Sequence, residues 1–198
     1  MPLLPETRNF LAYLQKHREM RDRIKAGPDK TILYAGDGFP TLGGKRFTPI
    51  WRELKSYQGR YQQKHQNHQT QPPSVVETLH DVLEKLPAPP PNVGTLQSYA
   101  EKLAEQEKRA NGPHGAGVIW RALSGIFASN AQGKVWFLVG SHVDPDTKVF
   151  ALTEVHVLRR NANISSTSRD MLEYYVRCVQ KRDPDIAGGY LPSDLLAG

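Results

Sequence analysis

Apolar residues recur three or four positions apart in several stretches of this sequence, a spacing that predicts amphipathic helices. Residues 117–133 fit either one amphipathic helix or a strand that breaks into a helix. Thr48 followed by Pro49 marks another helix start, because threonine caps helices and proline favours their first turn. The remaining helices are expected at residues 7–25, at residues 74–86 before Pro87, from near Thr95 onward, and at residues 165–182.

Runs of strand-forming residues predict strands at 31–36, 134–141 and 149–158. The last two are joined by HVDPDTK, whose Asp-Pro-Asp-Thr is typical of a turn, so we expect a hairpin there. Strands and helices follow one another without the regular period of a doubly wound sheet. The sequence therefore predicts the α+β class, with a small antiparallel or mixed sheet and flanking helices.

The domain layout follows from length and composition. A chain of 198 residues suits one domain, so we expect a single α+β domain over 1–198. A Gln-rich loop at 57–73 and a Pro-rich loop at 86–94 flank what is expected to be an inserted helical segment. Residues 183–198 are expected to form an irregular tail.

The net charge of the chain indicates which class of partner to expect. Lys and Arg number 26 against 20 Asp and Glu, which gives a net charge of +6. Such an excess favours acidic partners such as nucleic acid or nucleotides. The single cysteine excludes an internal disulfide and a cysteine-based zinc site, and no metal site is expected. The N-terminus lacks the pattern of a secretory signal, so we expect a cytoplasmic protein or one exported without such a signal, and no membrane span.

Glu154 and His156 are the leading candidates for chemistry. On the expected strand they share one face with Phe150, Leu152 and Leu158, where a carboxylate needs partners. A structural pair at a strand end is one interpretation. The other is metal-independent RNA cleavage, with Glu154 as base, His156 as acid, and Arg121 or Arg159 on the phosphate. Small α+β ribonucleases of the toxin type use this chemistry. Lys45, Arg46 and Lys134 are expected to bind the substrate.

A second enzyme class uses some of the same residues. VIWRALSG (118–125) resembles the aromatic-Arg strand of mono-ADP-ribosyltransferases, FASN (127–130) resembles part of their Ser-Thr-Ser element, and TEVHVL (153–158) resembles the strand with their catalytic Glu. The resemblance implies that NAD is the substrate, that Arg121 holds its phosphates, and that Glu154 stabilises the ribosyl cation. Leu152 stands where many of these enzymes have a second Glu or Gln, and Arg121 lies too near the Ser element for the usual fold.

These alternatives define the functional hypotheses. The first is a toxin-like enzyme acting on RNA or a nucleotide without a cofactor, with a cognate inhibitor protein as partner. The second is an ADP-ribosyltransferase or NAD glycohydrolase, for which NAD is the substrate. The third is a non-catalytic module that binds nucleic acid or docks to another protein.

Overall fold

The computed structural model describes residues 2–35, 39–40, 47–48, 76–112, 114–139 and 149–181. The helices are α1 (Pro5–Lys16), α2 (Arg18–Arg23), α4 (Leu79–Leu83), α5 (Leu96–Asn111), α6 (Gly117–Ser129), the π-helix η1 (Phe150–Glu154), α7 (Val155–Arg160) and α8 (Ser166–Lys181). The strands are β1 (Thr31–Ala35), β2 (Phe39–Pro40), β3 (Phe47–Thr48) and β4 (Val135–Val139).

Two parallel strands form the centre of one half of the molecule. β1 pairs with β4 in a register that sets Thr31 opposite Val135. Ile32, Leu33 and Phe137 are all buried, so both faces of the pair are covered, as is usual for parallel strands. β2 and β3 form a separate antiparallel pair. The α+β class is thus confirmed, whereas the larger pairing is parallel where we had expected an antiparallel or mixed sheet.

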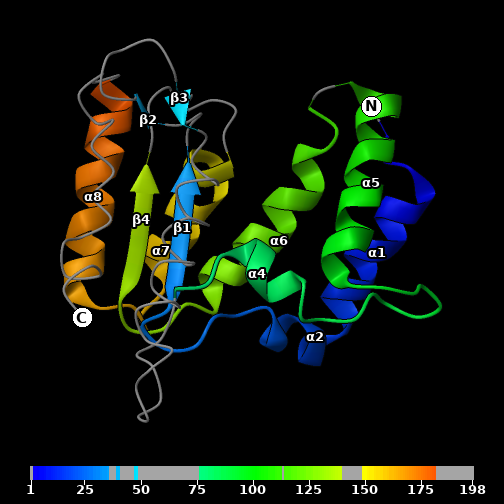
Figure 1. The fold of residues 1–198 in the computed structure, drawn as a ribbon, viewed down its shortest axis with the longest axis horizontal. Coiled ribbons are helices and arrows are strands. Elements are labelled where there is room, and N and C mark those ends of the chain that lie inside the picture. The colour runs from blue at the N-terminus through cyan, green and yellow to red at the C-terminus, as the bar shows by residue number, and fades with distance from the viewer. Residues whose placement is uncertain are drawn as a thin grey trace.

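In Figure 1, α8 lies on the β4 side of this pair, and α6, α5 and α1 extend away from it on the β1 side. α8 packs beside β4, and α7 packs against α8 and α6. α6 connects the two halves, because it also contacts α5, α1 and α4. Both strands point to the upper end of the view, and α6 begins at that same end.

The core is one cluster that runs through both halves. Ile119, Leu123 and Phe127 of α6 are fully buried and recur at the four-residue spacing of one helix face. Leu96 and Leu103 of α5 are also fully buried in that cluster. The segment expected to be a helical insertion therefore contributes directly to the core. Residues 117–129 form one helix, which settles the ambiguity between helix and strand.

The expected strand at 149–158, and with it the hairpin, is wrong. Residues 150–160 are helical, first as η1 and then as α7. Burial explains the outcome, because Glu154, Val155 and Leu158 are buried while His156 is exposed. Spacings of one, three and four residues belong to a helix, whereas a strand would bury every second residue. Packing against α6 outweighs the preference of Val155 and Val157 for a strand.

The other predicted helices are found with shifted ends. The helix expected over 7–25 is divided at His17 into α1 and α2. A capping box formed by Thr78 and Asp81 begins α4. α5 begins beside Thr95 as expected, and the Thr95 side chain caps it. At the start of α8, the Ser165 hydroxyl accepts a hydrogen bond from the Ser168 amide.

Three predicted features fall outside the described residues. They are the Gln-rich loop at 57–73, the body of the helix expected after Thr48, and the tail at 183–198.

Asn161, in the loop between α7 and α8, holds several elements together. Its buried carboxamide donates to the carbonyl oxygens of Ala128, Ser129 and Ala131 at 3.0, 3.2 and 2.9 Å. Ala128 and Ser129 end α6 and Ala131 follows it, so the carboxamide caps carbonyl groups at the end of this helix and just beyond it. The Ala128 carbonyl oxygen also accepts from the Ala131 amide at 3.3 Å. The side-chain oxygen of Asn161 accepts a hydrogen bond of 2.9 Å from the backbone amide of Asn163. One side chain thus joins the end of α6 to the start of the segment that leads into α8.

Replacing Asn161 with Ala should lower the free energy of unfolding by about 1–3 kcal/mol, because three carbonyl groups at the end of α6 lose the donor that the carboxamide supplies. Urea denaturation followed by circular dichroism would measure this loss. Asn163→Ala is the matched control, since Asn163 is exposed and takes part through its backbone, with its amide donating to Asn161 and its carbonyl accepting from Gly133. Equal stability of the two variants would contradict the role assigned to Asn161.

Candidate functional site

Glu154 is a carboxyl group buried between two helices and a strand. It lies where η1 passes into α7, and only 6 % of the residue is exposed. Its side chain shares a hydrogen bond with the hydroxyl of Ser124 on α6. Glu154, Leu158 and Asn161 are spaced four and three residues apart, so all three lie on the face of α7 that packs on α6. The helix register that Asn161 fixes therefore also positions Glu154.

The protonation state of Glu154 follows from this environment. Burial raises the pKa of Glu154 from 4.5 to about 8, and the hydrogen bond to Ser124 offsets only part of that rise. Among the described residues, no Lys or Arg forms an ion pair with it. The group is consequently neutral at pH 7 and carries a proton that it can donate.

Tyr34 extends the site toward solvent. It lies near the carboxyl end of β1, and 39 % of it is exposed. Partial burial raises the pKa of Tyr34, and the nearby carboxyl groups of Glu154 and Asp81 raise it further. Ligands of open parallel sheets bind beyond the carboxyl ends of the strands, which is the end at which Tyr34 and Glu154 are found.

Arg121 is positioned one helical turn before Gly125 on α6. Its Nη1 atom lies 3.2 Å from the place that a Cβ would take on Gly117, so the guanidinium reaches back over the first turn of the helix. Gly125 faces Thr153 of η1, whose Cγ2 would be 3.2 Å from an added Cβ. Arg121 forms no ion pair within the described part of the chain. A cation without a carboxylate at the positive end of a helix favours an anionic ligand.

His156 does not pair with Glu154. Successive residues of a helix are rotated by about 100°, so two positions apart point in nearly opposite directions. Glu154 accordingly faces α6, whereas His156 is exposed to solvent. The expectation that the two side chains flank one phosphate depended on a strand, and it is wrong for that reason.

Arg159 and Lys134, two other predicted site residues, are not gathered around Glu154. Arg159 binds Glu173 of α8 through two hydrogen bonds of 2.7 and 2.8 Å. Lys134 precedes β4, at the opposite end of the strand, and its ammonium lies 3.7 Å from the centre of the Trp136 ring. Lys45 and Arg46 lie outside the described residues. Among the predicted site residues that the structure describes, Glu154 is thus associated with the helix that carries Arg121.

Ser124 and Tyr34 are site residues that the sequence analysis did not select. The available signal was a hydroxyl on the buried face of a helix, between Leu123 and Phe127. Such a group needs a hydrogen-bond partner, and Glu154 supplies it.

A second buried carboxyl group, Glu107 of α5, has the opposite character. It is fully buried, and it accepts a 2.8 Å hydrogen bond from the backbone amide of Leu4, at the start of α1. Burial opposes its ionisation, but the nearby hydroxyl of Thr7 and the hydrogen bonds from Leu4 and Asn111 outweigh burial and lower the pKa of Glu107. Glu107 is therefore a charged structural cap for α1, whereas Glu154 is neutral.

Comparisons with known proteins add no relative: no family model, curated protein or solved structure matches the chain. None of the helices in the described ranges has the length and apolarity needed to cross a membrane. Within those same ranges, His, Cys, Asp and Glu side chains form no group of three that could hold a metal ion.

The raised pKa of Glu154 predicts an unusual dependence of stability on pH. The folded state keeps a proton that the unfolded chain releases above pH 4.5, so stability should fall as pH rises toward 8 and level off beyond it. The slope is up to about 1.4 kcal/mol per pH unit. Glu154→Gln should remove this slope and be more stable than the wild type at pH 8, as measured by urea denaturation from pH 5 to 9.

Glu107→Gln is the matched control for that experiment. Because the pKa of Glu107 is lowered, its contribution to stability is present above pH 4.5 and is lost as the pH falls below that value. Its replacement should therefore destabilise the protein at neutral pH. If Glu154→Gln behaves like Glu107→Gln, Glu154 is an ionised structural group and not a neutral acid.

Proposed function

We propose that the protein is an enzyme that acts on a nucleotide-containing substrate, and that its reaction is metal-independent cleavage of RNA. The observation that carries the proposal is the buried, uncharged carboxyl group of Glu154 beside the helix that bears Arg121. A carboxyl group kept protonated at neutral pH suits general acid catalysis. The net charge of +6 supports an anionic substrate.

Glu154 has the acid role in this mechanism, and not the base role that the sequence suggested. The 2′-oxygen of the ribose attacks the phosphorus, and the bond from phosphorus to the 5′-oxygen breaks. The proton of Glu154 passes to the departing 5′-oxygen, while the 2′-hydroxyl loses its proton to water. Arg121 stabilises the charge that develops on the non-bridging phosphate oxygens. Ser124 holds the carboxyl group in position through its hydrogen bond.

The roles of Glu154 and His156 can be separated by mutation. Glu154→Gln should reduce cleavage of a fluorogenic single-stranded RNA by about 10²–10⁴-fold, because the proton donor is lost. His156→Ala should cleave at the wild-type rate, since this side chain points away from Glu154. The wild-type rate should decline above pH 8, as Glu154 loses its proton. Unchanged cleavage by Glu154→Gln, or no cleavage of RNA by the wild type, would refute the proposal.

A second candidate is an NAD-consuming transferase or glycohydrolase. The observation in its favour is that Glu154 and Arg121, which this chemistry needs, belong to helices in contact, whereas His156, which it does not need, is turned outward. The segments that resemble the strands of mono-ADP-ribosyltransferases are helices in this chain, α6 and η1 with α7. This candidate therefore depends on the two side chains and not on the fold.

Incubation with NAD distinguishes the two candidates. If RNA is the substrate, the protein should release no nicotinamide, as measured by chromatography, while it cleaves RNA. Release of nicotinamide that is lost in both Glu154→Gln and Arg121→Ala, and retained in His156→Ala, would replace the first candidate with the second.

A further inference from the structure

A groove separates α2 from α6 on the side of the molecule away from α4. It has a volume of about 390 Å³ and is lined by Arg18, Arg21, Asp22, Ala122, Gly125 and Ile126 among others. One wall is therefore polar and comes from α2, and the other is formed by small and apolar residues of α6. The volume lies within the usual range for ligand sites, and the groove is open to solvent.

The walls of the groove are held at a fixed separation. Asn130, at the end of α6, donates hydrogen bonds of 2.7 and 3.2 Å to the carbonyl oxygens of Arg21 and Ile24. This contact ties the last turn of α2 to the end of α6. Ala122 and Gly125 lack bulky side chains, so the α6 wall of the groove leaves space between this helix and the arginines of α2. The groove is consequently a feature of the packed helices and not of a loose segment.

The charges in the groove favour an anion. Arg18 lies 3.4 Å from Asp22, in a pair whose side chains are 83 % and 56 % exposed. An exposed pair of this kind is worth little, so an incoming anion can compete for Arg18. Arg21 has no ion-pair partner in the described part of the chain. Two guanidinium groups thus face one carboxylate.

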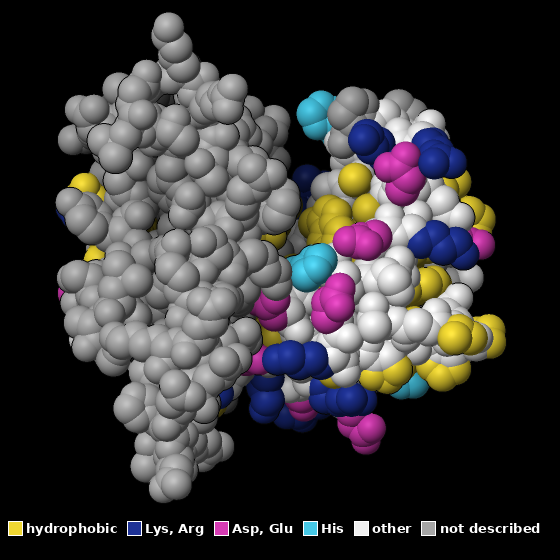
Figure 2. All heavy atoms as spheres, in the orientation of Figure 1, with side chains coloured by type: hydrophobic (Ala, Val, Ile, Leu, Met, Phe, Trp, Pro, Cys, Tyr) yellow, Lys and Arg dark blue, Asp and Glu magenta, His cyan; other side chains and the backbone are white. Residues whose placement is uncertain are grey.

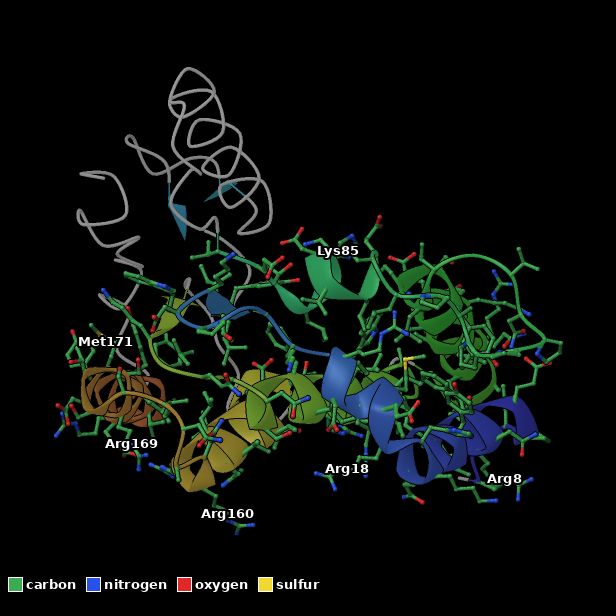
Figure 3. All side chains as sticks on the ribbon, turned by 90° about the horizontal axis from the view of Figure 1, so that it is seen from below. Arg8, Arg18, Lys85, Arg160, Arg169 and Met171 are labelled. Atoms are coloured by element: carbon green, nitrogen blue, oxygen red, sulfur yellow. The ribbon has the colours of Figure 1, made fainter. Side chains whose placement is uncertain are left out.

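The surroundings of the groove extend this positive character. Figure 3 shows Arg8, Arg18 and Arg160 projecting from the same side of the molecule, opposite Lys85. By contrast, Lys, Arg, Asp and Glu side chains are interspersed on the face formed by α4 and α5 (Figure 2). A row of guanidinium groups from α1, α2 and α7 suits a ligand with repeated negative charges better than a single small anion.

We propose that this groove binds the phosphate backbone of a single-stranded nucleic acid. The planar guanidinium of arginine donates two parallel hydrogen bonds to a phosphate, which explains the need for Arg18 and Arg21 rather than any cation. Because the groove is open to solvent, a strand that enters it can continue beyond it. The described residues that line the groove include no aromatic side chain, so it contacts phosphates without stacking on bases and binds with little sequence preference.

The groove is distinct from the site around Glu154, although both use α6. Ala122, Ile126 and Ser129 line the groove, whereas Ser124 bonds to Glu154 at the end of η1. Gly125 lies at the border between the two, since it lines the groove and also faces Thr153 of η1. The inference does not rest on catalysis by Glu154. Binding should be retained in Glu154→Gln, so a failure of the groove and a failure of the proposed enzyme can be told apart.

Fluorescence anisotropy with a labelled single-stranded 2′-O-methyl RNA 12-mer, which lacks the free 2′-hydroxyl that the proposed cleavage needs, tests the groove directly. The double variant Arg18→Ala/Arg21→Ala should bind at least tenfold more weakly at low salt. The slope of log affinity against log salt should become shallower by roughly 1–2, because about two phosphate contacts are lost. Asp22→Asn should bind more tightly than the wild type, because the carboxylate that competes for Arg18 is removed. A scrambled RNA sequence should bind equally well.

The double variant Arg109→Ala/Lys108→Ala is the matched control, because it removes the same charge from α5, away from the groove. Its affinity should stay close to that of the wild type. Equal weakening by both double variants would show that binding depends on net charge and not on the groove, and would overturn the inference. An absence of RNA binding by the wild type, or unchanged binding by Asp22→Asn, would overturn it too. Melting temperatures measured alongside should be unchanged, since Arg18 and Asp22 are exposed.

Discussion

The hydrogen bonds from Asn161 to the end of α6 are the contact on which most of this arrangement depends. They end α6 at the point where the chain must turn into β4, and they anchor the segment that begins α8. They also fix the register of α7 along α6, since Asn161 and Glu154 lie on the same face of one continuous helix. The position of the candidate site is therefore set by a backbone cap that lies two helical turns away from it.

At the start of α8, the side chain of Ser168 supplies a hydrogen-bond partner for a backbone amide of β4. The hydroxyl of Ser168 accepts a 2.8 Å hydrogen bond from the Val135 amide at the start of β4. A short parallel pair leaves edge groups without partners, and a buried hydroxyl satisfies one of them. Asn161 and Ser168 thus act at the two ends of the same loop, and together they secure α8 against the strands.

Two buried carboxyl groups show how local contacts decide charge. Glu107 receives hydrogen bonds from the start of α1 and is ionised, so it stabilises the joint between α1 and α5. Within the described residues, Glu154 shares a hydrogen bond with the neutral hydroxyl of Ser124, and burial keeps the carboxyl group protonated. Keeping such a group costs stability at neutral pH, and natural proteins tolerate that cost most often at functional sites. The groove lined by Arg18 and Arg21 lies on another face of α6, so one helix supports both candidate surfaces.

The sequence by itself determined the elements whose local signals agree with their packing. The helices at α5 and α8 follow from apolar spacing, and Thr95 caps α5 as its residue type suggests. β1 and β4 follow from short apolar runs, because strands covered on both faces are apolar throughout. The α+β class followed from these elements. The sequence also determined the positive net charge of the chain. Only the structure shows that arginines gather beside α2.

Only the tertiary structure decided the parallel pairing of β1 with β4, because these strands are far apart in the sequence and no local turn specifies their register. It likewise decided that residues 150–160 are helical. Val155, Val157 and their neighbours favour a strand locally, whereas burial of Glu154 and Leu158 against α6 and the bonds of Asn161 are available only to a helix. That choice separated Glu154 from His156 and joined it to Ser124, since side chains two apart share a face in a strand and diverge in a helix.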